Sequence, residues 1–270
     1  MRGKKKAAVR PKTEAELAKM RVSCAKLGEV HARLKEMIRP GISTAEIDEA
    51  GERFIREAGG EPNFKNYQGY PAAICVSVND EVVHGIPKRD RILEEGDIVS
   101  LDCGLVYDGF HSDAARTWGV GEVHPNAAAL IAHTRESFFA GIRYAVAGGH
   151  LHDISNGIAA YLQPYGYGIV RDLTGHGIGR ALHEEPVIPN YRMPVFNRGI
   201  LLEPGMTLAV EPMVTLGTWR VYWEDDGWTV RTDDGAPAAH YENTIAIRPE
   251  GECEILTLMP GEEADGSGAV

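Results

Sequence analysis

One pattern occurs twice along the chain: two predicted helices followed by a strand that ends in a carboxylate. Aligning Gly41 with Gly148 superposes the helices, and aligning 93–102 (LEEGDIVSLD) with 202–211 (LEPGMTLAVE) superposes the strands. The two alignments differ in offset by only two residues, which indicates a diverged internal repeat. Such a repeat predicts one pseudo-symmetric domain, with Asp102 and Glu211 facing a shared cleft where a ligand site is expected.

Start and stop signals place the helices of both halves. Capping boxes at Thr13/Glu16 and Ser43/Glu46 each precede a run of apolar residues at helical spacing. Glycine or proline ends each run. The predicted helices run from Thr13 to just before Pro40, from Ser43 to just before Gly59, from Asn126 to about Ala147, and from about Asp153 to just before Pro164.

These elements predict an α+β domain at 13–258, with halves at about 13–124 and 125–250. The basic start at 1–12 is expected to be a disordered arm, which we consider a weak candidate for contact with ribosomal RNA, and 259–270 a flexible tail. The net charge of -11 argues against DNA or other nucleic acid as the main ligand of the folded part. We expect no membrane span and no signal peptide, and therefore a cytoplasmic location.

The four cysteines lie far apart and form no Cys-x-x-Cys pair, which favours free thiols over disulfides or a zinc finger. They are Cys24, Cys75, Cys103 and Cys253.

Two carboxylates lie close together in a predicted hairpin. A turn at Asp108-Gly109 would place Gly104 opposite Asp113, and strand alternation puts Asp102 on the same face. Two neighbouring carboxylates repel unless one is protonated or cations lie between them. We expect Gly104 to leave the space for metal and water. The alternative on this stretch alone is a solvated acidic turn.

Two further residues suggest what these carboxylates hold. His176 lies in the glycine-rich run TGHGIG, where close approach to its ring is possible, and Glu242 shares a strand face with His240. With Asp102, Asp113 and Glu211, they make four carboxylates and one imidazole, which suit two divalent cations such as Mn, Fe, Co or Zn. Two such cations, roughly 3.5 to 4 Å apart, form a recurrent hydrolytic site.

From about Thr13 to about Leu258, the chain resembles type I methionine aminopeptidases of the bacterial kind, because it carries a series of motifs in the same order. They are ICVSVNDEVVHGIP at 74–87, the Asp102 and Asp113 spacing, GHGIG at 175–179, HEEP at 183–186, VEPM at 210–213 and YENT at 241–244. The resemblance implies the pita-bread (creatinase/aminopeptidase) fold, with pseudo-twofold halves around a central antiparallel sheet. It also implies a cytoplasmic metalloprotease that removes the initiator methionine of nascent chains when the second residue is small.

The resemblance also implies roles for individual residues. Asp102 would be the terminal ligand of one metal, Asp113 and Glu242 the bridges, and His176 and Glu211 ligands of the other metal, with Glu211 also accepting a proton. His84 would bind near the scissile amide, and His183 would donate to the oxyanion. The methionine pocket would be lined by Tyr67, Tyr70, Cys75 and Trp228, with His84 at its edge and Phe64 and Leu182 at positions that vary within the family.

Two alternatives remain open on the sequence. An Xaa-Pro aminopeptidase or prolidase-like enzyme would share the fold and the five metal ligands, but it usually carries an additional N-terminal domain. A catalytically inactive binding module would be expected to have lost ligands, and all five are present here. We expect a monomer acting on peptides and nascent chains.

Overall fold

The computed structural model describes residues 9–262. Its helices are α1 (Glu14–Lys35), α2 (Thr44–Glu57), α3 (Pro125–Ile142) and α4 (Leu151–Leu162), with 3-10 turns η1 (Tyr67–Gly69) and η2 (Gln163–Tyr165). Its strands are β1 (Glu61–Pro62), β2 (Cys75–Val78), β3 (Glu81–Val83), β4 (Ile98–Tyr107), β5 (Phe110–Gly119), β6 (Gly168–Ile169), β7 (Gly175–Gly177), β8 (Glu184–Ile188), β9 (Thr207–Val210), β10 (Met213–Thr215), β11 (Val221–Trp223), β12 (Val230–Thr232), β13 (Ala238–His240), β14 (Glu242–Ala246) and β15 (Glu254–Ile255).

A nine-stranded antiparallel sheet joins the two halves. Its strand order is β1-β4-β5-β14-β9-β7-β8, with β2 added to β4 and β15 added to β14. The central contact between halves is β5 against β14, where Ala115 pairs with Glu242.

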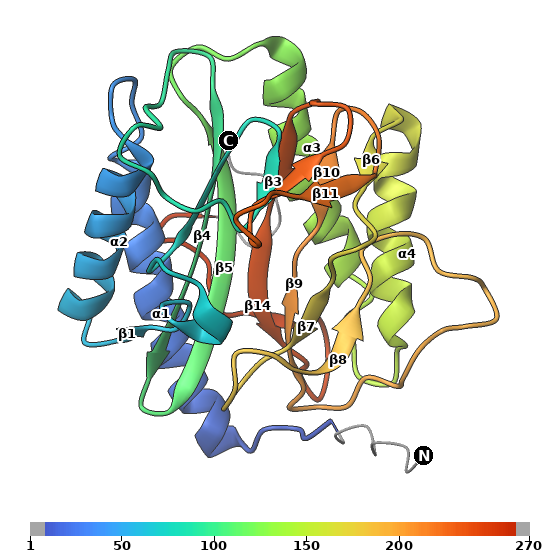
Figure 1. Cartoon of the computed structure of the whole chain (residues 1–270). Helices are drawn as coiled ribbons and strands as arrows, with labels where there is room; N and C mark the ends of the chain where they lie inside the picture. The colour runs from blue at the N-terminus through green and yellow to red at the C-terminus, as the bar shows by residue number, and fades with distance from the viewer. Residues whose placement is uncertain (1–8, 263–270) are drawn as a thin grey trace, which may run out of the picture.

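Two smaller sheets, β13-β10-β6 and β11-β12-β3, complete the fold (Figure 1). This arrangement confirms the predicted α+β architecture with a central antiparallel sheet.

Helix starts follow the sequence signals more closely than helix ends. Both capping boxes are present at Thr13 and Ser43, as predicted. In the second half, α3 ends at Ile142 rather than near Ala147. Backbone hydrogen bonds explain the early end: the amide of Gly148 donates to Leu202 and the amide of Leu202 donates to Gly149, which draws this stretch away from the helix.

Each half packs its own helix pair against the sheet. Leu27 and Leu34 of α1 belong to one buried cluster with Val99 and Leu101 of β4. Helices α3 and α4 form a second cluster with β9 and β14, and Figure 1 shows the two helix pairs on opposite sides of the view. Because strand side chains alternate, residues 99, 101, 103 and 105 face the helices, and Asp102 is directed to the other face of β4.

Both ends of the described chain contact the body. The Lys12 ammonium, with its side chain only 8% exposed, lies 2.6 Å from a carboxylate oxygen of Glu184. Glu262 is equally buried and pairs with Arg116 at 2.9 Å. The predicted arm and tail therefore each include a residue that packs on the body, Lys12 and Glu262, and their remainders at 1–8 and 263–270 lie outside the described residues.

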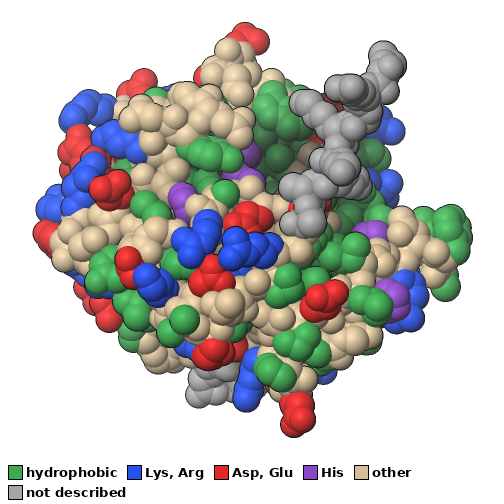
Figure 2. Space-filling model, turned by 90° about the horizontal axis from the view of Figure 1, so that it is seen from below, with side chains coloured by type: hydrophobic (Ala, Val, Ile, Leu, Met, Phe, Trp, Pro, Cys, Tyr) green, Lys and Arg blue, Asp and Glu red, His purple; other side chains and the backbone are tan. Residues whose placement is uncertain are grey.

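The surface carries charged side chains of both signs, and the four cysteines are free. Figure 2 shows Lys or Arg side chains interspersed with Asp and Glu beside a hollow bordered by hydrophobic and histidine side chains. Cysteines 24, 75, 103 and 253 are all free thiols, as predicted. Over residues 9–262, we find no helix with the length and apolar character needed to cross a bilayer.

Candidate metal centre

The predicted hairpin forms in the expected register. Tyr107 pairs with Phe110 and Gly104 with Asp113, so Asp102 and Asp113 lie on one face of β4 and β5. The predicted role of Gly104 is wrong, however. A Cβ there would lie 2.4 Å from the side-chain oxygen of Asn63 and 2.7 Å from the Ser112 carbonyl. The glycine therefore makes room for the buried Asn63 amide, which donates to the Ser112 carbonyl at 3.2 Å.

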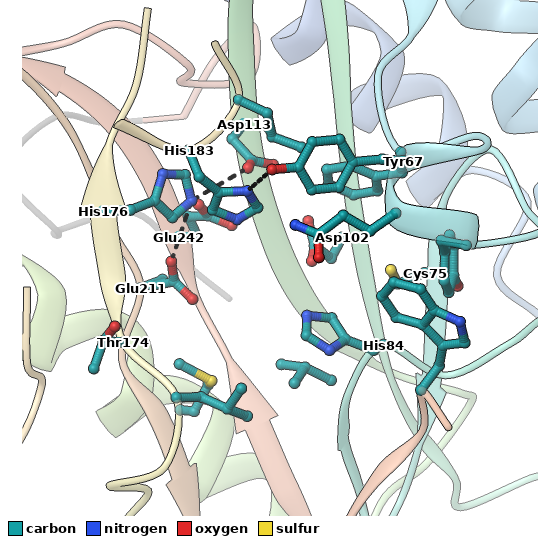
Figure 3. A pocket seen from close by; sticks show the side chains of 18 residues that line it. Tyr67, Cys75, His84, Asp102, Asp113, Thr174, His176, His183, Glu211 and Glu242 are labelled. Atoms are coloured by element: carbon teal, nitrogen blue, oxygen red, sulfur yellow. Dashed lines mark hydrogen bonds and ion pairs between the residues drawn. The ribbon is translucent and has the colours of Figure 1, made fainter. Parts of the chain in front are cut away.

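Strands from both halves bring the five proposed ligands to one cavity (Figure 3). Possible ligand atoms of Asp113, His176 and Glu242 all lie within 4.8 Å of one another. Nε2 of His176 is 3.6 Å from an oxygen of Asp113 and 3.6 Å from an oxygen of Glu211. Asp102 lines the same cavity. The repeat thus places its two terminal carboxylates, Asp102 and Glu211, at a common cleft.

The carboxylates of this cleft are stable as anions only if cations join them. Burial raises the pKa of Asp102, Asp113, Glu211 and Glu242 well above the usual range, and the negative charge of Asp113 adds to this for the other three. One oxygen each of Asp102, Asp113 and Glu242 is buried and has no hydrogen-bond partner within residues 9–262. Buried, unpartnered carboxylate oxygens with an imidazole nitrogen are a donor set that fits divalent cations.

His176 presents one ring nitrogen to the carboxylates. Its Nδ1 lies 2.8 Å from the carbonyl oxygen of Gly177, an acceptor, so Nδ1 carries the proton and donates. The lone pair is then on Nε2, the atom that faces Asp113 and Glu211. Burial lowers the pKa of His176 to about 4, which keeps the ring neutral near pH 7. Gly175 on the same strand allows close packing, because a Cβ there would lie 2.4 Å from the Ala209 carbonyl.

The same cavity, about 260 Å³ in volume, extends from the carboxylates into an aromatic region. Tyr70 and Trp228 meet edge to face with their ring centroids 5.2 Å apart, and the His84 ring lies 6.3 Å from Trp228. All predicted pocket residues border this cavity: Phe64, Tyr67, Tyr70, Cys75, His84, Leu182, His183 and Trp228. The region is therefore apolar and aromatic beside a cluster of charges.

Two histidines flank the carboxylates without joining them. His84 has a left-handed backbone at φ 59°, a region that few residues other than glycine occupy. The next residue must be glycine, since a Cβ on Gly85 would lie 2.4 Å from the Val76 carbonyl. Nδ1 of His183 lies 2.8 Å from the Tyr67 hydroxyl. Burial lowers the pKa of both histidines to about 4.

Sequence reasoning missed one residue near the charges. Nε2 of His240 lies 3.9 Å from Glu211 and 4.0 Å from Glu242, and neither ring nitrogen has a hydrogen-bond partner among the described residues. Strand alternation had placed His240 on the face of Glu242, so a signal was present. Of the cavity's other lining residues, Val83, Thr174 and Met213 lie in sequence runs named above, and Gln68 and Leu173 do not.

Comparison with known proteins identifies the family. The sequence profile of metallopeptidase family M24 matches residues 18–249. A methionine aminopeptidase of Clostridium acetobutylicum is 49% identical over 247 residues, which cover 92% of this chain and 98% of that protein. The chain belongs to the methionine aminopeptidases of metallopeptidase family M24. Membership makes it a hydrolase that uses divalent metal, and it confirms the resemblance found in the sequence motifs.

Solved structures of family members have the same fold as this chain. The crystal structure of methionine aminopeptidase from Thermotoga maritima matches with a TM-score of 0.90 and 42% identity, over 93% of this chain and all of that one. The Xaa-Pro dipeptidase of Bacillus anthracis matches with a TM-score of 0.75 and 26% identity, but only 62% of that chain is covered. The predicted pita-bread fold is therefore confirmed, and the Xaa-Pro alternative is not favoured.

Proposed function

We propose that this protein removes N-terminal methionine from peptides and nascent proteins whose second residue is small. One observation carries the proposal: a buried cluster of metal-ligand side chains opens directly into an aromatic pocket within one cavity. Aromatic rings and the Cys75 thiol suit a flexible, polarizable thioether. The methionine side chain would occupy the region between Tyr70, Cys75 and Trp228, with Tyr67 and Phe64 beside it.

Five residues would hold two divalent cations. Asp102 would be the terminal ligand of one ion, and Asp113 and Glu242 would bridge the pair. His176, through Nε2, and Glu211 would complete the second ion. Four carboxylates balance the charge of two divalent ions, and the unpartnered oxygens of Asp102, Asp113 and Glu242 are the atoms that such ions would satisfy.

The residues around the ions would divide the chemical steps. Cations bound here would lower the pKa of a water molecule and polarise the scissile carbonyl. Glu211, which lines the same cavity, would accept the proton of that water. The Tyr67 hydroxyl, donating to Nδ1 of His183, would keep the proton on Nε2, and His183 could then donate to the developing oxyanion. His84 would bind near the scissile amide.

The proposal also covers the metal, the oligomeric state and the cellular location. Mixed oxygen and nitrogen ligands accept Co, Mn, Fe or Zn, and metal availability would select among them. We propose that the protein acts as a monomer in the cytoplasm on chains leaving the ribosome. The basic residues at the start of the chain would provide an electrostatic contact with ribosomal RNA.

Peptide hydrolysis after metal removal tests the proposed function. The chelated protein is titrated with Co²⁺ and assayed by mass spectrometry on Met-Ala-x and Met-Arg-x peptides. We expect release of methionine from Met-Ala-x only, with activity increasing up to two equivalents of metal. Equal cleavage of Met-Arg-x would contradict the small-residue rule, and full activity in excess chelator would contradict the metal assignment.

A further inference from the structure

Glu262 is an acidic side chain held inside the molecule. It lies beyond residues 18–249, the range that the M24 profile matches. Its carboxylate accepts a hydrogen bond from the Tyr241 hydroxyl at 2.7 Å and another from the amide of Met259 at 3.1 Å. The Arg116 guanidinium lies 2.9 Å from one of its oxygens, and Arg135 lies 3.9 Å from the other. The pairing lowers the pKa of Glu262 despite its burial.

The partner of Glu262 reaches the metal-ligand strand. Arg116 is only 2% exposed, and its guanidinium lies over the Tyr241 ring at 4.4 Å. It donates to the backbone carbonyl of Glu242 and to the side-chain oxygen of Asn243, the latter at 2.8 Å. Arg116 therefore ties β5 to β14 at the residue proposed to bridge the two cations.

We propose that Glu262 is a positioning residue for the metal centre, acting through Arg116 on Glu242. This inference rests on the proposed function, because it requires Glu242 to bind metal. A buried guanidinium keeps its geometry when a carboxylate neutralises it and fixes its direction. Without Glu262, the Arg116 charge is left without its closest carboxylate and turns toward water. The Glu242 carbonyl then loses its donor, and the Glu242 carboxylate loses its fixed place.

Cobalt binding to the full chain tests this inference. The metal-free wild type, Glu262→Gln and a matched control, Glu254→Gln, are titrated with Co²⁺ by calorimetry, and their visible Co²⁺ spectra are recorded. Glu254 also pairs with an arginine, Arg21 at 2.8 Å, but on the partly exposed surface. Loss of a residue that orients metal ligands weakens metal affinity by roughly 10-fold or more. For Glu262→Gln we expect Co²⁺ affinity to fall by this factor and the visible Co²⁺ spectrum to change. For Glu254→Gln we expect the affinity and the spectrum of the wild type.

A double variant separates positioning from stability. Arg116→Met with Glu262→Leu removes the Arg116–Glu262 pair together, so no Arg116 charge is left without its carboxylate, while the donor to Glu242 stays absent. We expect this protein to fold and to bind Co²⁺ as weakly as Glu262→Gln. Wild-type affinity in either variant would overturn the inference. A wild type that binds no Co²⁺ would instead overturn the proposed function, and the inference with it.

Discussion

Replacing Asp113 with Asn tests the charge argument quantitatively. Ligand atoms of Asp113 and Glu242 lie within 4.8 Å of each other in a buried site. Two unit charges at that separation repel by about 3.5 kcal/mol at an effective dielectric constant of ~20. Asparagine keeps the size of the side chain and removes one charge. Without metal, we therefore expect Asp113→Asn to be more stable than the wild type, by at most about 3.5 kcal/mol.

Metal should reverse this order. A ligand at one thousand times its Kd stabilises the folded protein by about 4.1 kcal/mol, which exceeds the repulsion of about 3.5 kcal/mol. The variant lacks a bridging carboxylate and should gain much less. In a protein of this size each kcal/mol shifts the Tm by roughly 2 to 4 °C. Calorimetric melting should therefore show the variant several degrees above the wild type in chelator and below it in excess Co²⁺. The reasoning would be refuted if Asp113→Asn melted below the wild type in chelator. It would also be refuted if Co²⁺ raised the Tm of the variant as much as that of the wild type.

The buried carboxyls also make the stability of the metal-free protein depend on pH. A carboxyl whose pKa is raised on folding stabilises the protein at low pH, and this contribution is lost as pH rises through the raised pKa. Burial raises the pKa of Asp113 and Glu242, so the metal-free wild type should lose stability with rising pH. The buried His176, with its pKa lowered to about 4, is neutral above that pH. As pH rises above the ordinary range of a carboxyl pKa, the Tm should therefore fall more steeply for the wild type than for Asp113→Asn.

Three further single substitutions and one double variant test separate parts of the structure. His183→Ala should lower kcat by roughly 10²- to 10³-fold and leave Co²⁺ affinity unchanged; loss of metal would contradict its role as a donor. Trp228→Ala should raise the KM of Met-Ala-x peptides roughly tenfold, because the thioether loses buried contact, and an unchanged KM would remove Trp228 from the pocket. Gly104→Ala should destabilise the protein by about 1 to 3 kcal/mol in denaturant unfolding. Adding Asn63→Ala should cost less than the sum of the single changes, and strict additivity would contradict the contact.

Local signals in the sequence predicted the parts of the fold that depend on neighbouring residues. The capping boxes at Thr13 and Ser43 and the hairpin register around Gly104 follow from hydrogen bonds over a few residues. The internal repeat extended this to the tertiary level, because it linked Asp102 to Glu211 before any contact was known. The family motifs then supplied His84, His183 and the pocket residues, which no local pattern distinguishes from ordinary surface side chains.

Contacts between distant segments could not be predicted in this way. The space beside Gly104 is filled by Asn63, 41 residues earlier in the chain, and no periodicity relates the two. The tail predicted at 259–270 includes Glu262, yet Arg116, 146 residues away, pairs with it inside the molecule. Such pairings depend on how strands stack across the whole sheet, and only the tertiary structure shows them.

Direct competition between two peptides is the most decisive test of the account. Xaa-Pro dipeptidase shares the fold, so the pocket must make the difference. Metal-loaded protein is mixed with equal amounts of Met-Ala-x and Ala-Pro-x peptides, and the ratio of their kcat/KM values is read from product formation by mass spectrometry. The account predicts rapid release of methionine and little cleavage of Ala-Pro-x. Preferential cleavage of Ala-Pro-x would contradict it.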